Sequence, residues 1–261
     1  MSEWKIEAPE TIQFDEIPSD LRVNLVGGEV ELRAGEGPAT LEVRQVTGPE
    51  LQVSLAQGRL EISQEQPHPS WGLSKVSASL AIQVPADCKV HLEAVSASVL
   101  AEGLAADVKL ETVSGEITLE SLSGKTRATT VSGELNARGQ AGELRGETVS
   151  GDVTLDAYLA NAVRLESVSG DVTADLQQAG STATAEVQTV SGAVYLRLAS
   201  EPSQAVRVDS VSGRLTSSFP ELKAKSGPGS RTLKGALGEG QGEVRVSTVS
   251  GAVAVLAEAS A

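Results

Sequence analysis

Serine is the residue whose repetition first suggests chemistry in this chain, because it recurs inside a fixed Val-Ser-Gly motif. The motif occurs at Val113-Ser114-Gly115, Val131-Ser132-Gly133, Val149-Ser150-Gly151, Val168-Ser169-Gly170, Val190-Ser191-Gly192, Val211-Ser212-Gly213 and Val249-Ser250-Gly251, preceded by the variant Val95-Ser96-Ala97. A serine nucleophile on a strand-to-helix turn needs the pattern Gly-x-Ser-x-Gly, which the sequence lacks. A nucleophile is also needed once rather than in every repeat, so we interpret these serines as structural.

Carboxylates recur at the same interval and could bind calcium or carry acid–base chemistry. They lie three residues after the valine of successive motifs, at Glu116, Glu134, Asp152 and Asp171. The calcium-binding solenoid pattern Gly-Gly-x-Gly-x-Asp is absent. Since a catalytic pair is needed once, their repetition favours a ladder of solvated side chains.

The remaining reactive residues do not form a motif. His68 and His91 stand apart, and Cys88 has no Cys or His at ligand spacing. Gly124-Lys125-Thr126 imitates the end of a phosphate-binding loop, but Leu119 stands where that loop needs its first glycine. We therefore predict no catalytic residue, no cofactor and no metal site, and we predict that the protein is not an enzyme.

The elements that position these residues follow from the spacing of the motif. Counted from Val95, the intervals are 18, 18, 18, 19, 22, 21 and 38 residues. Apolar side chains alternate five and three residues before each valine and again four and six residues after it, as at Val108, Leu110, Ile117 and Leu119. Alternation indicates strands, and a fixed period indicates stacked repeats. The pattern predicts an all-β, single-domain-like β-solenoid of about 18–22-residue rungs with parallel in-register strands and almost no helix.

The phase of the alternation reverses across each motif, which predicts a corner there rather than the middle of a strand. We expect the valine to close the core, the serine to bond the local backbone and the glycine to supply a positive φ. Outward positions stack as well. A mainly basic column lies four residues before each valine and a mainly acidic column two residues before it: His91, Lys109, Arg127, Arg145, Arg164, Glu186, Arg207 and Arg245, beside Glu93, Glu111, Thr129, Glu147, Glu166, Gln188, Asp209 and Ser247.

Two regions break the repeat. Residues 1–75 alternate like strands and end in a proline-containing stretch, which predicts an N-terminal β-strand region that caps a repeat domain at 76–261. The interval of 38 residues fits one looped rung or two rungs, and the Gly/Pro-rich composition of 217–242 favours a long loop. This stretch is the most basic of the chain, so Lys223, Lys225, Arg231 and Lys234 form a candidate interaction loop. Residues 252–256 show no cap, which predicts self-association through the open solenoid ends.

Composition excludes several partners. The net charge of −14 excludes nucleic acid, which needs a basic surface. No run of 18 apolar residues occurs, so we predict no direct membrane insertion. A single cysteine permits no internal disulfide, and no export signal is visible at the start, so we predict a cytoplasmic location.

The repeats resemble those of a known family. The likeness lies in the Thr-Val-Ser-Gly-Glu/Asp-Ile/Val-Thr-Leu units at 112–119 and 148–155, in the segment at 80–86, and in the looped last repeat ending at Gly251. Together they resemble the DUF4097 family of bacterial β-strand-repeat proteins, labelled "putative adhesins". The resemblance implies an all-β solenoid without known catalytic residues, some of whose relatives are linked to the cell envelope and its stress signalling.

Three functions are compatible with these observations. The first is a non-enzymatic structural or interaction protein that presents a rigid, charge-patterned surface to a protein, an envelope component or another copy of itself. The second is a self-assembling cytoskeletal or filament-type solenoid. The third and weakest is a polysaccharide-active enzyme, which needs stacking aromatics where the repeats offer only Tyr158, Tyr195 and Phe219.

Overall fold

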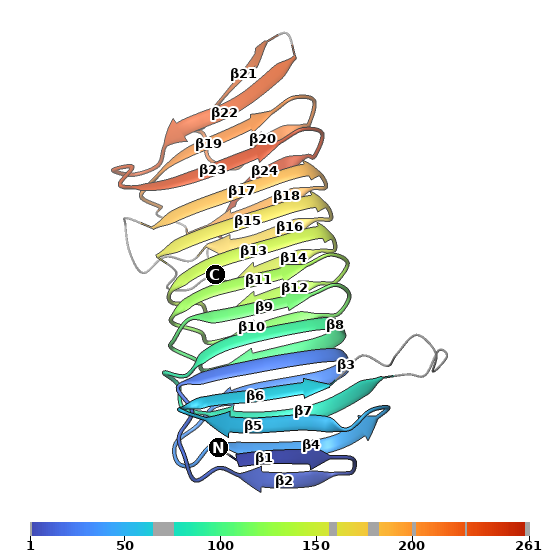
Figure 1. Cartoon of the computed structure of the whole chain (residues 1–261). Coiled ribbons are helices and arrows are strands. Elements are labelled where there is room, and N and C mark those ends of the chain that lie inside the picture. Colours follow the sequence, from blue (N-terminus) through green and yellow to red (C-terminus); the bar gives the residue numbers. More distant parts are fainter. Residues whose placement is uncertain are drawn as a thin grey trace. The chain divides into compact units, whose positions relative to one another are not determined.

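The structure, a computed structural model, describes residues 2–64, 76–156, 161–176, 183–199, 202–227 and 229–258, and within them every regular element is a strand. The chain divides into two compact units, Met1–Gly133 and Glu134–Ala261. The all-β prediction is confirmed, and each unit is a stack of β-solenoid rungs whose strands are colored in chain order in Figure 1.

The first unit builds its rungs from parallel strands in register. Its rung strands are β3 (Asp20–Ala34), β8 (Lys89–Glu102), β9 (Val108–Thr112), β10 (Ile117–Glu120) and β11 (Lys125–Thr130). The long strand β8 turns a corner, so that its first half pairs with β9 and its second half with β10. β11 continues the same sheet on β9, with Thr126 opposite Val108. The offset of 18 residues between partners is the period of the sequence.

The first rung lies earlier in the sequence than the repeats suggest. β3 pairs with β8 along almost its whole length, which places Gly27 opposite Ser96 and Gly28 opposite Ala97. Residues 26–28, Val-Gly-Gly, are therefore a degenerate copy of the corner motif, separated from the next copy by 69 residues. The distance in sequence hides this rung, although the paired glycines between two alternating runs were a signal of it.

The other N-terminal strands extend both faces of this rung. They are β1 (Ser2–Ile6), β2 (Glu10–Gln13), β4 (Thr40–Thr47), β5 (Leu51–Ala56), β6 (Arg59–Gln64) and β7 (Ser77–Val84). β6 and β7 run parallel to the two halves of β3, β5 and β4 lie antiparallel beyond them, and β1 and β2 are outermost. The stretch at 64–75 that was predicted to mark a domain boundary lies, from residue 65 onward, outside the described residues, and the division at 75 stays a prediction.

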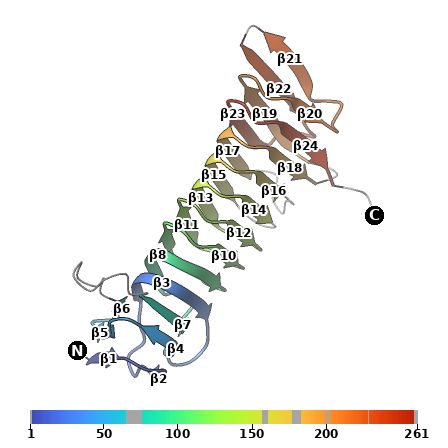
Figure 2. The same cartoon turned by 90° about the vertical axis from the view of Figure 1, so that its right-hand side faces the viewer.

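The second unit repeats the two-strand rung. Its strands are β12 (Leu135–Arg138), β13 (Glu143–Ser150), β14 (Val153–Asp156), β15 (Ala162–Ser169), β16 (Val172–Leu176), β17 (Thr184–Ser191) and β18 (Val194–Leu198). Strands β13, β15 and β17 form one parallel sheet and β12, β14, β16 and β18 the other, as two rows of this unit in Figure 2. Partner residues stay in register across insertions of one to four residues, so the extra residues lie between strands.

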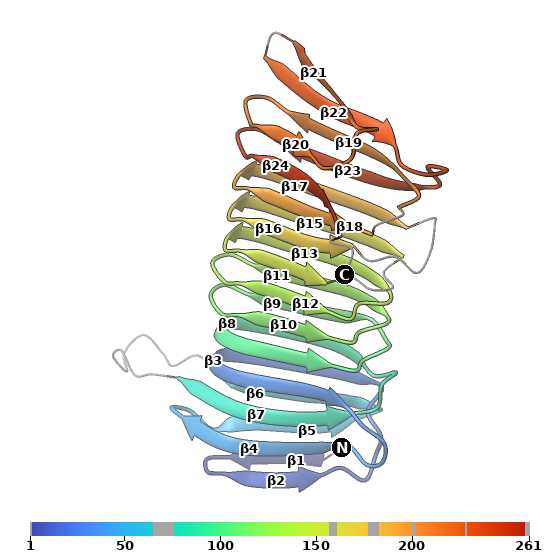
Figure 3. The same ribbon diagram turned by 180° about the vertical axis from the view of Figure 1, so that it is seen from behind.

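The end of the second unit departs from chain order. The remaining strands are β19 (Gln204–Ser210), β20 (Leu215–Ser217), β21 (Lys223–Gly227), β22 (Ser230–Ala236), β23 (Gly242–Thr248) and β24 (Val253–Ala257). β23 pairs with both β17 and β19, and β24 with both β18 and β20, so the last rung of the sequence lies inside the stack (Figure 3). β19 then pairs antiparallel with β22, which pairs with β21.

Two predictions about this end are corrected by the pairing. The stretch at 217–242 contains an antiparallel hairpin rather than only a long loop, because Lys223–Gly227 and Ser230–Ala236 form a ladder on the edge of β19. The segment at 252–256 is not an open edge, because β24 has a partner strand on each side. The 213–251 interval thus contains β20, the β21–β22 hairpin and β23, and β23 is the first strand of a separate rung.

The core lies between the two sheets of each rung. The side chains predicted to point inward are buried, including Leu110, Ile117, Leu155, Val208 and Val253. Each buried Val, Leu or Ile stabilises the fold by about 1.5–3 kcal/mol relative to its exposed state. Aliphatic stacking from rung to rung therefore holds the corners at fixed positions.

Candidate functional site

The corner serines connect neighbouring rungs. The Ser132 hydroxyl donates to the Val113 carbonyl at 3.4 Å, and the Ser132 backbone N–H donates to the same oxygen at 2.9 Å. Equivalent hydroxyl contacts join Ser96 to Val26, Ser114 to Val95, Ser191 to Val168, Ser250 to Val190 and Ser212 to Val249. None of these serines contacts a histidine that could accept its proton, within the ranges that the structure describes. The geometry is that of a rung-to-rung contact rather than of a nucleophile.

The corner valines do not close the core, and that prediction was wrong. Their exposed fractions run from 42% at Val95 to 53% at Val211. The reason is the alternation itself: the residue before each valine points inward, so the valine points outward. The result within each unit is an exposed aliphatic column beside the serines, which the inward phase of Thr112 and Thr130 would have indicated.

The corner glycines are required mainly by the closeness of the neighbouring rung. A Cβ at Gly192 would lie 2.1 Å from the Gly170 carbonyl oxygen, and Gly192 also has a φ of +128°. At Gly251 and Gly213 the φ is not positive, yet a Cβ would lie 1.8 Å from the neighbouring corner oxygen. The expected positive φ is therefore present at some corners only, and close approach is the common reason.

The residue before the valine of each Val-Ser-Gly motif is a buried threonine or serine, whose hydrogen bonding differs from rung to rung. The Gly251 N–H donates to Thr248 Oγ1 at 3.0 Å, and the Gly213 N–H donates to Ser210 Oγ at 2.7 Å. Thr148 Oγ1 has no hydrogen-bond partner among the described residues, because the Gly151 N–H donates instead to Ser169 O at 3.2 Å. The hydroxyl at this position of the motif therefore has a hydrogen-bond partner in some rungs and none, among the described residues, in the rung of Thr148.

Two of the repeated carboxylates accept hydrogen bonds from backbone N–H groups of the next rung. Asp152 Oδ1 accepts the N–H of Asp171 at 2.8 Å, and Asp171 Oδ1 accepts the N–H of Ala193 at 2.8 Å. Each acid therefore bonds the corresponding residue one rung away. This contact accounts for Asp152 and Asp171, whereas Glu116 accepts a hydrogen bond from the Thr118 hydroxyl.

The outward charge columns form a connected network in the second unit. Arg164 binds Glu166 at 2.6 Å and Glu186 at 2.7 Å, while Arg145 binds Glu147 and reaches Glu166 at 3.3 Å. The hydrogen bond that Arg164 donates to Glu166 is the main cause that raises the pKa of Arg164. The predicted ladder of alternating charge is present here, and its carboxylates bridge successive rungs.

His91 lies in a cluster that the sequence spacing did not indicate. Its Nε2 is 3.0 Å from Glu93 Oε1 and 3.9 Å from Glu111 Oε2, a set of ligand types that suits Zn²⁺. The Lys109 ammonium lies 2.8 Å from Glu111 Oε2 and 3.3 Å from His91 Nε2. That ammonium already supplies the positive charge which a metal would bring. The signal for the cluster was the 18-residue register, which places His91 beside Lys109 and Glu93 beside Glu111.

Two of the other candidate residues, Cys88 and Thr126, are buried in the fold. Cys88 is buried, and burial raises the pKa of its thiol to about 12, so the thiolate needed for nucleophilic attack is suppressed. Thr126 is buried on β11 rather than exposed at the start of a helix, so Gly124-Lys125-Thr126 has no phosphate-loop geometry. His68 and Tyr158 lie outside the described residues.

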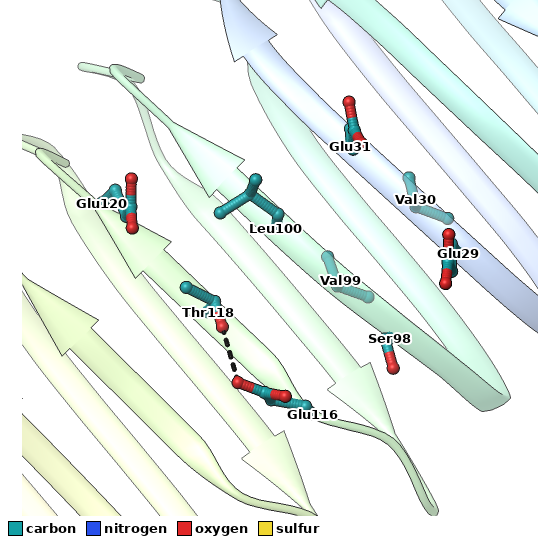
Figure 4. Close-up of a pocket in the computed structure, with 9 residues that line it drawn as sticks. All are labelled: Glu29, Val30, Glu31, Ser98, Val99, Leu100, Glu116, Thr118 and Glu120. Carbon is teal, nitrogen blue, oxygen red and sulfur yellow. Dashed lines mark hydrogen bonds between the residues drawn. The ribbon is translucent and has the colours of Figure 1, made fainter.

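A shallow acidic groove of about 340 Å³ lies on the outer face of the first unit. Figure 4 shows Glu29 and Glu31 of β3 on one side, Glu120 of β10 and Glu116 just before β10 on the other, and Leu100 of β8 between them. Register places Glu31, Leu100 and Thr118 in one row. Two of these acids already have partners: Arg44 binds Glu31 through two bonds of 2.9 and 3.1 Å, and the Thr118 hydroxyl donates to Glu116 at 3.1 Å.

Glu31, one of the acids of this groove, is unsuited to act as the general acid in hydrolysis of a glycoside. The hydrogen bond from Arg44 holds the pKa of Glu31 below its ordinary value. A general acid needs the opposite shift, so that it stays protonated until it transfers its proton. Of the aromatics counted for carbohydrate stacking, Phe219 is buried and only Tyr195 is exposed within the described part of the repeats.

A second groove, of about 600 Å³, lies on the second unit beside the hairpin. It brings together three of the four predicted interaction residues, Lys223, Lys225 and Lys234, and adds Arg207 and Arg245 from neighbouring strands. Two acids, Glu221 and Glu243, also line it. Arg231 instead donates to the Gly213 carbonyl at 2.9 Å and to the Ser212 carbonyl at 3.3 Å. The sequence did not indicate the two added arginines, since their contribution depends on the order of the strands.

The repeat architecture and its corner geometry agree with one family in particular. The family described as Toastrack DUF4097 matches residues 11–184, which is about two thirds of the sequence. The chain belongs to the DUF4097 family. The resemblance inferred from the Val-Ser-Gly units is thereby confirmed, and it extends into the N-terminal strands.

Solved structures resemble this DUF4097 protein in fold. A "putative adhesin" from Bacteroides fragilis superimposes with a TM-score of 0.55 at 14% identity, over 97% of this chain and 98% of that one. A "putative adhesin" and a "putative lipid binding protein" from Parabacteroides distasonis reach TM-scores of 0.38 and 0.39 at 14% and 9% identity, covering 96% and 97% of this chain and 96% and 97% of theirs. At these identities the likeness concerns the fold alone. No curated protein matches the chain.

No helix in the described part of the chain is long and apolar enough to cross a membrane.

Proposed function

We propose that this DUF4097 protein is a non-enzymatic interaction protein whose β-solenoid surface binds a component of the bacterial cell envelope, in adhesion or in envelope stress signalling. The family and the adhesin-named relative support an adhesion-like role. The cytoplasmic location predicted from the sequence remains a prediction beside this proposal.

The observation that carries the proposal is the fixed outward charge pattern of the second unit. The network of Arg145, Arg164, Glu166 and Glu186 holds its side chains across three successive strands of one sheet. Side chains held by several partners lose little conformational entropy on binding, because they are already ordered. A pre-ordered, regular charged surface therefore favours recognition of a repetitive or extended partner.

The reactive residue types of the repeats support the same conclusion. The serines bond valine carbonyls of adjacent rungs, Asp152 and Asp171 bond backbone N–H groups, and the Cys88 thiol is buried. Their positions are explained by packing and hydrogen bonding. We therefore propose that the surface, and not a catalytic centre, is what the fold presents.

Filament formation receives less support than binding of a different molecule. Strand β21 is an edge of its sheet and carries Lys223 and Lys225, and lysines on an edge strand oppose pairing with an identical strand.

The proposal is tested by co-sedimentation of the purified protein with envelope fragments of its native host, with the cytosolic fraction as comparison. We expect retention on the envelope, and weaker retention for Arg164→Glu, which reverses one charge in the network. Arg197→Glu is the matched control, because Arg197 pairs with Asp175 at 3.0 Å on the other sheet of the same unit. Equal retention of all three proteins, or release of reducing ends from envelope polysaccharide, would contradict the proposal.

A further inference from the structure

The strands near the C-terminus carry an excess of positive charge, although the whole chain is acidic. The protein has a net charge of −14. The four adjacent strands β21, β22, β19 and β23 carry six cations, Lys223, Lys225, Arg231, Lys234, Arg207 and Arg245, and only two acids, Asp209 and Glu243. This concentration of positive charge on one sheet needs a physical reason.

Four of the cations form a row across the strands. Register places Lys223 opposite Lys234, Lys234 opposite Arg207, and Arg207 opposite Arg245. Neighbouring strands lie about 4.8 Å apart, and like charges directly opposite one another destabilise a sheet. We call these four residues the cation row. Stability alone would select against such a row.

The row is only partly neutralised within the protein. Asp209 binds Arg207 at 2.6 Å, and Glu243 binds Arg245 at 2.6 Å. The hydrogen bond from Arg207 is the main cause that lowers the pKa of Asp209, so this acid stays charged. Lys223 donates to a neutral group, the Pro220 carbonyl, at 2.7 Å. In residues 202–227 and 229–258 no carboxylate forms an ion pair with Lys234, so the hairpin end of the row keeps its positive charge.

The same hairpin presents an open strand edge. β21 pairs with β22 on one side, and all five of its residues are exposed. An antiparallel ladder directs alternate backbone groups away from the partner, so β21 offers N–H and C=O groups to an added strand. A second copy of β21 would bring Lys223 and Lys225 against their equivalents. An acidic strand would instead gain attraction from the same side chains.

We propose that the edge of β21 and the cation row form a docking site for an extended acidic segment of a partner protein, bound by strand addition. The backbone of the segment would pair with β21, and its carboxylates would reach Lys225 and the cation row in the adjoining groove. This inference rests on the proposed function of an interaction protein and names the chemistry of its partner.

The test uses a fluorescein-labelled decapeptide of alternating Glu and Thr as the probe. Fluorescence anisotropy should show binding that weakens as salt rises. Lys225→Glu and Lys234→Glu should each weaken it roughly fivefold or more, which is the scale of exchanging an exposed ion pair for a repulsion. Lys89→Glu is the charge-matched control, because Lys89 lies on β8 of the first unit, and it should bind the probe as the unaltered chain does. Folding of each variant is checked by circular dichroism.

Two further probes separate strand addition from charge alone. The same decapeptide N-methylated at alternate residues keeps its carboxylates but loses backbone donors, and it should bind at least fivefold more weakly. Equal binding of both peptides, or no effect of Lys225→Glu and Lys234→Glu, would overturn the proposal. Binding of a polyuronate or of phosphatidylglycerol vesicles, without binding of the decapeptide, would overturn it in favour of that class.

The two proposals fail separately. Envelope retention that persists in Lys225→Glu, together with an inert decapeptide, would overturn the docking site and leave the interaction role standing. Loss of envelope retention in every preparation would overturn the interaction role, whatever the decapeptide does.

Discussion

The buried threonine of the corner motif offers a test in which one substitution has opposite effects in two rungs. At Thr248 the hydroxyl oxygen accepts the Gly251 N–H at 3.0 Å, and both residues are buried. Thr248→Val leaves that N–H without an acceptor, which costs about 1–3 kcal/mol. The added methyl group returns about 0.8 kcal/mol of burial. We therefore expect a net loss of about 0.5–2 kcal/mol in the free energy of unfolding.

At Thr148 the balance is reversed. Its hydroxyl is buried and has no hydrogen-bond partner among the described residues, while the Gly151 N–H is satisfied by Ser169 O. Burial of an unpaired hydroxyl costs about 1–3 kcal/mol, which Thr148→Val removes. We expect this variant to be more stable than the unaltered chain by about 1–2 kcal/mol. The two valine variants should then differ by about 1.5–4 kcal/mol.

The assay is urea unfolding followed by circular dichroism, combined with amide hydrogen exchange at the two corner glycines. Exchange of the Gly251 amide should accelerate in Thr248→Val, and the Gly151 amide should be unaffected by Thr148→Val. Thr154→Val is the control, since Thr154 points outward on β14 and should change stability by less than about 0.5 kcal/mol. Shifts of the same sign in Thr148→Val and Thr248→Val would refute the reasoning, as would unchanged protection at Gly251.

Three further predictions concern a corner glycine, the histidine cluster and a paired acid. Gly192→Ala should lower the free energy of unfolding by about 1–3 kcal/mol more than Gly37→Ala in urea unfolding, because both have a positive φ but only Gly192 meets a carbonyl oxygen, and equal losses would contradict the role of close approach. Lys109→Gln should raise the affinity for Zn²⁺ in isothermal titration calorimetry by removing the competing ammonium, with unchanged zinc binding as the contrary result. Glu31→Gln should destabilise the protein at neutral pH and lose that effect in acid: the lowered pKa of Glu31 means that its stabilisation is present above the unfolded pKa, near the ordinary value of 4.5, and disappears as pH falls through the folded pKa. A pH-independent difference in thermal unfolding between Glu31→Gln and the unaltered chain would contradict this assignment.

The sequence predicts the rungs and their register because both follow from local alternation and a fixed period. Val108 and Thr126 pair because they occupy the same place in successive repeats, 18 residues apart. The direction of the corner valine also followed from this alternation, since the inward threonine beside it leaves only the outward position. The error concerning the valines arose from treating the apolar type of the residue as stronger evidence than its phase.

The order of the last strands could not be predicted from the same evidence. β19 and β23 carry equivalent inward patterns, so either could pair with β17. What distinguishes them is the hairpin, because β22 pairs antiparallel with β19 and occupies the edge that would otherwise be free. Pairing over such long sequence separations depends on competing edges rather than on local propensity. The grouping of Arg207 and Arg245 with the hairpin lysines depends on that order and was therefore invisible in the sequence.

In the acidic groove of the first unit, contacts within the protein account for two of the charged residues. In the groove beside the hairpin, such contacts neutralise only some of the cations. In the acidic groove of the first unit, Glu31 and Glu116 have partners within the same unit. In the stack of the second unit, glutamates such as Glu147 and Glu166 accompany Arg145 and Arg164 in the neighbouring column.

That accompanying column changes where the chain leaves its sequential order. Beyond Gln188 on β17, the positions equivalent to Glu147 and Glu166 are Ser247 on β23, Asp209 on β19, Thr232 on β22 and Lys225 on β21, of which Asp209 alone is an acid. From β23 to β21 the first column carries only cations, and the acids that bind them are Asp209 at Arg207 and Glu243 at Arg245. A substitution pattern that removes neutralising charge lowers stability unless a ligand supplies it. The end of the second unit is thus where the charge pattern departs from that of the preceding rungs, and the acidic partner proposed above would supply the missing negative charge.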